Sequence, residues 1–489
     1  MFWIRARSRV SRGLVAFALL LAGAAAAGGG LPPENECPVL TNIPGASPAE
    51  DATSFRLREG IELHFEDVLL LGSLLPPEVW RNRDTFFHDG MRLEIGPCHR
   101  RYATAEWYDA ATKRFAGQAS VDADGNLRGD VAGLPFPPDT IDPASPDAAV
   151  RWAWNAELRY RGSGPIGKFR LVDMPSRVGG IQTYEGNWFW LQTAHRADLP
   201  ASDYALPVAP DTEWVAGGYF AEPTPARNLA WRQLRPLQVA LDYERPDDTF
   251  VYVPTMKKMR RAGSGWVDGL YMPRYRVSGD AGGGALPIGG GIATNGAINP
   301  TAGESIQVTE NLRRGFTGLS LRPNAYVWRL QSQRVVLAPI NITRTGYPED
   351  RNRNFGESGL SVGNDRWDVR YAVVLQGTLK ERGLEYDFLT LWIDYQTGQP
   401  LYVVTRRKGG QQMEEVGILV SRYSGDLTRY PDWPGGAKAN VFDPVAEVFY
   451  DALEGGSGWR RESYDIVSTP PEDSELHRLT SPAVLDRLH

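Results

Sequence analysis

The sequence predicts a mostly β protein built on one large curved antiparallel sheet, with a few covering helices and long loops. Three observations predict this class. Glycine and proline, 52 and 36 of 489 residues, exceed average usage but stay below that of low-complexity chains. Hydrophobic residues (42%) and aromatic residues (11%) are sufficient for a large core. Runs in which apolar and polar residues alternate recur after about residue 150, which indicates strands rather than a helical array.

Residues 1–27 contain, in order, the basic, apolar and small-residue regions of a secretory signal. Four arginines without an acidic residue precede an apolar run from Leu14 to Ala22, and small residues follow. The apolar run is too short to span a bilayer comfortably, which disfavours the alternative of a membrane anchor. We therefore expect export to the periplasm and cleavage near Ala27.

The charge balance opposes a nucleic-acid partner. The formal net charge is −6, and without the four leader arginines 49 basic residues face 59 acidic ones, a net charge of −10. Binding to nucleic acid requires a positive field over some face of the protein.

Cys37 and Cys98 are the only cysteines. In an oxidising compartment such a pair is most simply a disulfide, here closing a loop of about sixty residues. A zinc site is disfavoured because no second pair lies nearby. A thiol nucleophile at Cys98 beside His99 is disfavoured because adjacent side chains of an extended segment point to opposite faces.

The mature chain is expected to have three parts. Residues 28–150 form a lead-in with short helices at 65–75 and 77–87, a strand at 91–95 and a hairpin turn at 121–127. Residues 151–464 form the β half-barrel, with a glycine-rich surface insertion at 279–303. Residues 465–489 form a C-terminal tail, and a helix is expected before it at 444–453.

The strands of the half-barrel are predicted from period-two alternation. The clearest case is 367–379, and the strands 385–395, 401–406 and 416–423 follow it as a meander. A hairpin is expected over 237–253, with its turn at 245–248. Trp152 and Trp154 are counted among the aromatic residues on strands.

The strand at 385–395 is apolar on both faces near its middle. One face can pack on covering elements, and the other then contacts either more protein, as in a thick sandwich core, or a ligand in a lipid-sized cavity. Under the second alternative, the ligand-binding residues are Trp367, Val369, Tyr371, Val373, Tyr386, Phe388, Trp392, Leu241 and Tyr243.

A basic cluster follows the strand at 250–253. It consists of Lys257, Lys258, Arg260 and Arg261. Two interpretations stay open: a strand edge that its charges protect from pairing, or a surface that docks an anionic head group or an acidic partner.

No motif for catalysis is present in the sequence. The six histidines are scattered, and the patterns of a serine-hydrolase elbow, a dinucleotide fold and a phosphate loop are missing. We expect no catalytic residue, no metal and no cofactor. A glycan hydrolase with two carboxylates brought together by the fold is the lowest alternative.

Several long segments resemble a family of exported proteobacterial proteins, domain-of-unknown-function family 1329. These segments are 90–98, 131–136, 252–261, 336–341 and 391–402, and the resemblance extends from about Glu59 to Tyr464. The family resembles outer-membrane lipoprotein-sorting proteins of the LolA and LolB type. The resemblance implies a half-open β-barrel with helices over its concave face and an apolar hollow for acyl chains. It also implies association with a large envelope exporter, and it assigns no catalytic residue.

The leading hypothesis is a periplasmic carrier or accessory protein that binds a lipid, an acyl chain or a lipoprotein in a curved β-sheet. The alternative is an envelope assembly factor that acts through protein contacts, with the basic cluster docking an acidic partner.

Overall fold

The fold is that of a computed structural model, which describes residues 31–40, 54–174, 181–200, 204–254, 257–261, 274–278, 305–309, 320–344, 353–380, 386–407, 414–452 and 458–487. The chain divides into two compact units, residues 1–32 and 33–489, and every element below belongs to the second. The predicted secretory signal at 1–27 and the glycine-rich insertion at 279–303 lie outside the described residues.

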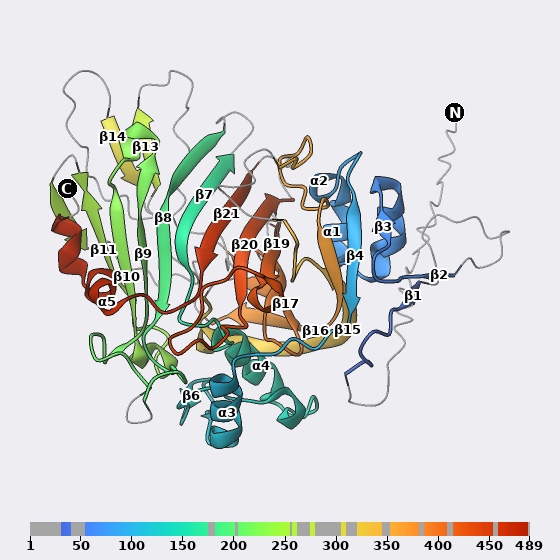
Figure 1. The fold of residues 1–489 in the computed structure, drawn as a ribbon, viewed down its shortest axis with the longest axis horizontal. Helices are drawn as coiled ribbons and strands as arrows, with labels where there is room; N and C mark the ends of the chain where they lie inside the picture. Colours follow the sequence, from blue (N-terminus) through green and yellow to red (C-terminus); the bar gives the residue numbers. More distant parts are fainter. Residues whose placement is uncertain are drawn as a thin grey trace, which may run out of the picture. The chain divides into compact units, whose positions relative to one another are not determined.

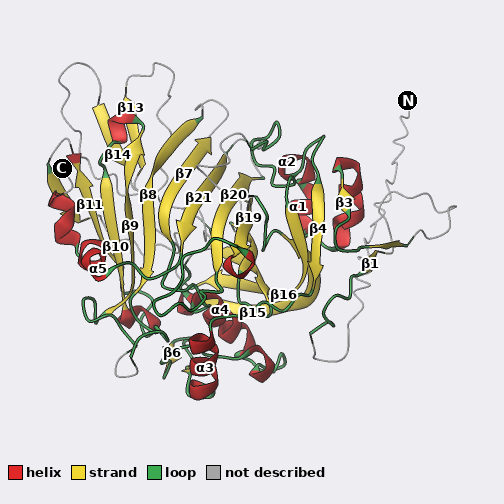
Figure 2. Ribbon diagram, in the orientation of Figure 1, coloured by secondary structure: helices red, strands yellow, loops and turns green. Residues whose placement is uncertain are grey.

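Fifteen strands form one open, almost wholly antiparallel sheet, which confirms the predicted fold class (Figures 1 and 2). The sheet does not close, because its path ends at β12 on one side and at β3 on the other. The order along this path is β12 (Lys258–Arg261), β11 (Asp248–Val253), β10 (Ala230–Pro236), β9 (Thr212–Glu222), β8 (Gln182–Gln192), β7 (Ile166–Met174), β21 (Trp459–Val467), β20 (Phe442–Asp451), β19 (Glu414–Tyr423), β18 (Pro400–Arg406), β17 (Phe388–Asp394), β16 (Arg366–Leu379), β4 (Leu93–Cys98) and β3 (Glu62–Leu63).

The sheet branches at β16. The long strand β15 (Tyr326–Ala338) pairs along one edge of β16. The other edge is shared, since β17 pairs with positions 372–378 and β4 pairs in parallel with positions 366–369. This parallel pair brings the lead-in into the same sheet as the C-terminal half of the chain.

The meander β16–β17–β18–β19 confirms the prediction from period-two alternation. Alternate residues of β16 face different clusters: Ala372 and Val374 belong to one buried cluster, and Val373 and Leu375 belong to another. The sheet is therefore covered on both faces at this point.

Helix α4 (Ala148–Glu157) covers one face of this region. It packs on β15 and β16, as Figure 1 shows, and it contributes Trp152 and Ala153 to the cluster that contains Val373 and Leu375. The placement of Trp152 and Trp154 on a strand was thus wrong. Alanines at four of the ten positions of this segment favour a helix.

The lead-in covers the other face. The predicted short helices are confirmed as the 3₁₀-helix η1 (Phe65–Ser73) and the α-helices α1 (Pro77–Arg81) and α2 (Arg83–Phe86). Their apolar residues Leu71, Val79 and Phe86 are fully buried in the cluster that contains Ala372 and Val374.

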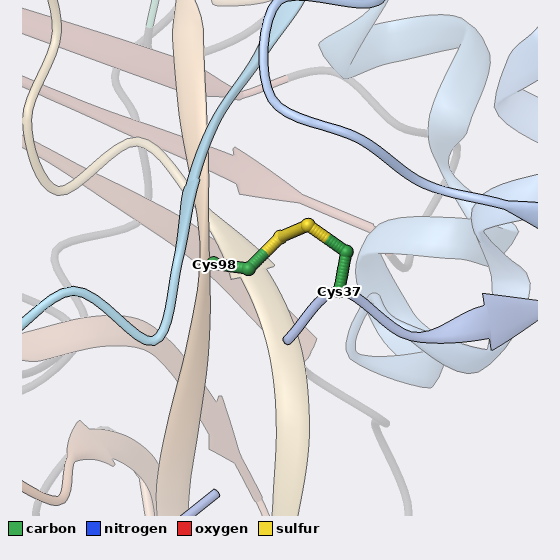
Figure 3. The surroundings of a disulfide bond; sticks show 2 residues. All are labelled: Cys37 and Cys98. Atoms are coloured by element: carbon green, nitrogen blue, oxygen red, sulfur yellow. A yellow bond between two sulfur atoms is a disulfide. The ribbon is translucent and has the colours of Figure 1, made fainter. Parts of the chain in front are cut away.

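The predicted disulfide joins Cys37 to Cys98 with a Cα separation of 5.2 Å (Figure 3). Cys98 is the last residue of β4, and the nearby Asn35 N–H donates to the Cys98 carbonyl at 2.8 Å. The disulfide therefore fastens the first described residues to the parallel strand pair.

The remaining elements are short or peripheral. Three small hairpins pair β1 (Val39–Leu40) with β2 (Phe55–Arg56), β5 (Ser120–Val121) with β6 (Leu127–Arg128), and β13 (Arg274–Ser278) with β14 (Ser305–Thr309). The hairpin turn expected at 121–127 is thus confirmed. The other helices in the described residues are α3 (Glu106–Phe115), α5 (Asp473–Thr480) and the 3₁₀-helices η2 (Pro138–Thr140), η3 (Thr224–Ala226), η4 (Leu237–Ala240), η6 (Pro323–Ala325), η7 (Ser424–Asp426) and η8 (Pro482–Arg487).

Two further predictions were wrong. The segment 237–240 forms η4 rather than a strand, since Pro236 precedes it and Asn324 donates to the Val239 carbonyl at 2.8 Å. The segment 444–453 is not a helix, because 442–451 forms strand β20 between β19 and β21. No described helix is long and apolar enough to cross a membrane.

Candidate functional site

A hollow of about 540 Å³, counted with the solvent space at its mouth, lies between the loop that follows α4 and the sheet. Its apolar lining comes mainly from β8, β18, β19 and β20, and its polar lining comes from the loop and from Gln399, Ser421, Glu447 and Ser468. The lining residues are Arg159, Arg161, Pro165, Trp190, Gln399, Pro400, Leu419, Val420, Ser421, Phe442, Pro444, Glu447 and Ser468.

The loop 158–165 is held close to the sheet by backbone hydrogen bonds. Ser163 N–H donates to the Ser468 carbonyl at 3.0 Å, and Trp190 N–H donates to the Pro165 carbonyl at 2.8 Å. This approach requires glycine at two positions with positive φ. A Cβ on Gly162 would overlap the Ser468 carbonyl, and a Cβ on Gly164 would overlap the Trp190 carbonyl.

The loop carries two buried arginines into the wall of the hollow. The Arg161 guanidinium stacks over the Trp190 ring at 4.6 Å and contacts the Glu157 carboxylate at 3.4 Å. Arg159 donates to Gln399 Oε1 at 3.1 Å and to the Ala156 carbonyl at the end of α4. Burial lowers the pKa of both guanidinium groups, and the charge of Arg161 lowers the pKa of Arg159 further.

The opposite wall is opened by an irregularity between β19 and β20. The pairing passes from Val420–Ala446 directly to Ser421–Pro444, so that Val445 has no cross-strand partner on β19. Proline has no N–H to donate and is tolerated in sheets at such bulges. Leu419 lines this wall on the same face as its cross-strand partner Glu447, whereas Val420 and Phe442 belong to the cluster on the other face of the sheet.

The predicted ligand-binding residues do not meet at this hollow, and none of the nine lines it. Trp367, Val369 and Trp392 lie in the cluster with the lead-in helices, whereas Val373 and Tyr386 lie in the cluster beneath α4. Protein side chains fill their surroundings.

The other four predicted residues are less buried. Tyr371 is half-buried and packs on Tyr395 with ring centroids 5.7 Å apart, and Phe388 is half-buried at the start of β17. Leu241 is 48% exposed, and Tyr243 is half-buried in the turn after η4. These two residues were chosen from an expected strand that the structure does not contain.

The basic cluster lies at the edge of the sheet. Lys258, Arg260 and Arg261 belong to β12, and Lys257 directly precedes this strand. All four are exposed, and Arg261 pairs with Asp248 on the neighbouring strand β11. This placement is compatible with both predicted interpretations.

A buried charge network behind the hollow was not predicted. Glu157 contacts Ser320 Oγ at 3.0 Å and Arg235 at 3.5 Å, and Asp247 pairs with Arg235 at 3.2 Å and with Arg322 at 2.7 Å. Arg161 links this network to the hollow through Glu157. Because the members come from segments far apart in the sequence, no spacing pattern identifies them.

The same network contains a histidine and a carboxyl with displaced pKa values. Burial alone would lower the pKa of His195, but the Asp130 carboxylate at 2.9 Å outweighs it and raises the pKa to about 9. Burial and the charge of Glu157 raise the pKa of Glu213 to about 7. Within the described ranges, no group of three or more His, Cys, Asp or Glu side chains could hold a metal ion.

Residues 85–274 match the family model described as "Protein of unknown function (DUF1329)". This match confirms the predicted family resemblance. The matched segment runs from α2 to the start of β13 and contains four residues of the hollow: Arg159, Arg161, Pro165 and Trp190.

Solved structures resemble the chain at low sequence identity. A domain described as a candidate outer membrane lipoprotein-sorting protein from Vibrio parahaemolyticus has 11% identity and a TM-score of 0.37, with 70% of this chain and 100% of that chain covered. A DUF1329 family protein from Desulfovibrio piger has 10% identity and a TM-score of 0.33, with 66% and 92% covered. A LolA superfamily protein from Nitrosomonas europaea has 12% identity and a TM-score of 0.30, with 67% and 94% covered. No curated protein matches the sequence.

Proposed function

We propose that this protein is an exported, non-enzymatic carrier that binds a molecule with an acyl chain in the hollow between the 158–165 loop and the sheet. The observation that supports this proposal is the hollow itself. An apolar wall with a few polar groups is typical of small-molecule sites.

In this proposal the ligand lies elsewhere than the residue pattern predicts. Trp367, Val369 and Val373 are fully buried among protein side chains, so the meander around them supports the sheet. Other residues line the hollow, Leu419 of β19 among them. Burial of an acyl chain there is favourable by about 0.8 kcal/mol for each CH₂ group removed from water.

Export to the periplasm is part of this proposal. It is supported by the secretory-signal pattern in residues 1–27 and by the Cys37–Cys98 disulfide, since disulfides persist in oxidising compartments.

The proposal is tested by lipid extraction and by ligand titration. Protein purified from the periplasm is extracted with organic solvent and examined by mass spectrometry, and the extracted protein is titrated with dodecanoate by calorimetry. We expect a co-purified acyl compound and saturable binding of dodecanoate. Absence of both would contradict the proposal.

A matched pair of variants locates the site. Leu419→Trp narrows the hollow, and we expect it to weaken dodecanoate binding at least tenfold. Val327→Trp adds the same ring at a position on β15 that is 56% exposed, and we expect it to leave binding unchanged. Equal loss in both variants would place the ligand elsewhere, and near-ultraviolet circular dichroism checks that both remain folded.

A second candidate function is docking of an acidic partner protein, and the exposed position of the basic cluster on the sheet edge favours it. Charge reversal of Lys257, Lys258, Arg260 and Arg261 is expected to abolish cross-linking to such a partner and to leave dodecanoate binding unchanged. Cross-linking of the reversed variant at the wild-type level would contradict this candidate.

A further inference from the structure

The polar wall of the hollow is built around Arg161. This side chain is about 7% exposed, stacks over Trp190 at 4.6 Å, and contacts one carboxylate, Glu157, through Nη2 at 3.4 Å. Its Nε–H has no acceptor within the described part of the chain, and neither does the Nε1–H of Trp190. Both residues line the hollow, so an acceptor bound there is one way to satisfy these donors.

Arg159 adds a second guanidinium to the same wall. Part of its hydrogen bonding is structural, since it donates to the last turn of α4 and to Gln399. The Glu447 carboxylate also lines the hollow. A group that binds here therefore faces two guanidinium groups and one carboxylate, and burial together with the neighbouring charge of Arg161 already disfavours the charged form of Arg159.

The chemistry of this wall fits an oxyanion. The guanidinium group presents donors in a fixed plane that matches carboxylate and phosphate oxygens, and it is hydrated more weakly than an ammonium group. Leu419 and other apolar residues line the same space. The hollow thus combines guanidinium donors with apolar lining residues.

We propose that the hollow recognises an anionic amphiphile, with a carboxylate or phosphate head group held at Arg161 and Arg159 and an acyl chain along the apolar lining around Leu419. This inference rests on the proposed function and specifies the ligand class of the same site.

The test compares three probes with the same chain length: dodecanoate, dodecyl phosphate and dodecanol. Each is titrated into extracted wild-type protein below its aggregation concentration. We expect the two anionic probes to bind at least tenfold more tightly than dodecanol. Preference for only one of them identifies the head group as carboxylate or phosphate.

Two variants and a control examine the wall. Arg161→Gln is expected to weaken binding of the anionic probes at least tenfold and to leave dodecanol binding unchanged, and Trp190→Phe removes one donor while keeping an aromatic ring. The control is Arg232→Gln on β10. Arg232 is also buried, stacks over Phe189 at 4.8 Å and has an Nε–H without an acceptor in the described residues, but it does not line the hollow.

The outcomes separate the two proposals. If dodecanol binds to the wild-type protein as tightly as dodecanoate and dodecyl phosphate do, the head-group proposal is wrong and the acyl-chain site remains. The same conclusion follows if Arg161→Gln keeps the preference for anions. If none of the three probes binds, both proposals fail. The comparison of the three probes on the wild-type protein tests the head-group proposal even if a variant does not fold.

Discussion

Arg370 and Asp394 form a buried ion pair between β16 and β17. Arg370 Nε and Nη2 donate to the two carboxylate oxygens at 2.8 and 3.1 Å, and both side chains are almost completely buried. Removing one partner leaves an uncompensated charge in the core. We therefore expect Asp394→Asn to lower the free energy of unfolding by about 3–5 kcal/mol, as measured by chemical denaturation.

The exposed pair Lys438–Asp432 is the matched control. Its atoms lie 2.6 Å apart, but both side chains are more than half exposed. Asp432→Asn is expected to cost less than about 1 kcal/mol because water screens the pair. Similar losses of unfolding free energy in Asp394→Asn and Asp432→Asn would contradict the expectation that burial makes an ion pair more costly to break.

Asp443 makes stability depend on pH. Burial raises its pKa to about 6, while the hydroxyl groups of Tyr430 and Ser468 donate to it. In the unfolded chain an aspartate has a pKa of about 3.9. Between these values the folded state binds more protons than the unfolded state, so the contribution of Asp443 to stability falls as the pH rises from about 4 to about 6.

The variant Asp443→Asn lacks this titration. We expect its free energy of unfolding to decline less steeply than that of the wild-type protein between pH 4 and pH 6, as followed by urea denaturation at several pH values. The other acidic groups are common to both proteins and cancel in the comparison. Parallel curves would show that Asp443 has an ordinary pKa.

At the scale of elements, the disulfide connects the lead-in to the sheet. It closes a loop between residues 61 positions apart, for which chain entropy gives a stabilisation of about 4 kcal/mol. We expect the variant Cys37→Ser/Cys98→Ser to lose about 2–5 kcal/mol in denaturant unfolding. A reducing agent should destabilise the wild-type protein to a similar extent and leave the variant unchanged.

Element prediction succeeded where a single signal was long. The alternation over 367–379 extends through a whole strand, so the pattern of β16 specified it and its neighbours. Element prediction failed where the sequence signal was short or was compatible with both a helix and a strand. Proline and alanine near residue 444 favour the start of a helix. In the structure Pro444 lies at a bulge, and pairing with β19 and β21 makes this segment a strand.

The site was harder to predict than the elements. Apolar alternation identifies buried residues such as Trp367, but it does not tell a packed core from an empty space. The hollow depends on a loop, a bulge and two arginines from separate segments. The sequence contained one local signal, the glycines at 162 and 164 beside Arg161, which mark a close approach of the backbone.

At the scale of the whole molecule, the open edge at β12 needs protection from pairing with another chain. Within the described residues β12 pairs only with β11, and its lysine and arginine side chains are exposed. Charged residues on an edge strand disfavour edge-to-edge association. We expect Lys258→Thr/Arg260→Thr to shift the protein toward larger species in size-exclusion chromatography with light scattering.

The control replaces cations away from the edge. Arg128→Thr/Lys438→Thr removes two exposed charges from other segments and should leave the size distribution unchanged. An unchanged distribution for the edge variant would indicate that the basic cluster does not protect the edge, and it would favour the docking interpretation.

The pairing of β7 with β21 also bears on the order in which the chain can fold. Strands β7 to β12 come early in the sequence, yet one edge of β7 has no partner until Trp459–Val467 is available, and β4 likewise awaits β16. Until those partners are available, β7 and β4 each have one unpaired edge. Contacts of such long sequence separation slow folding, and an unpaired edge can associate with other chains until the sheet is complete.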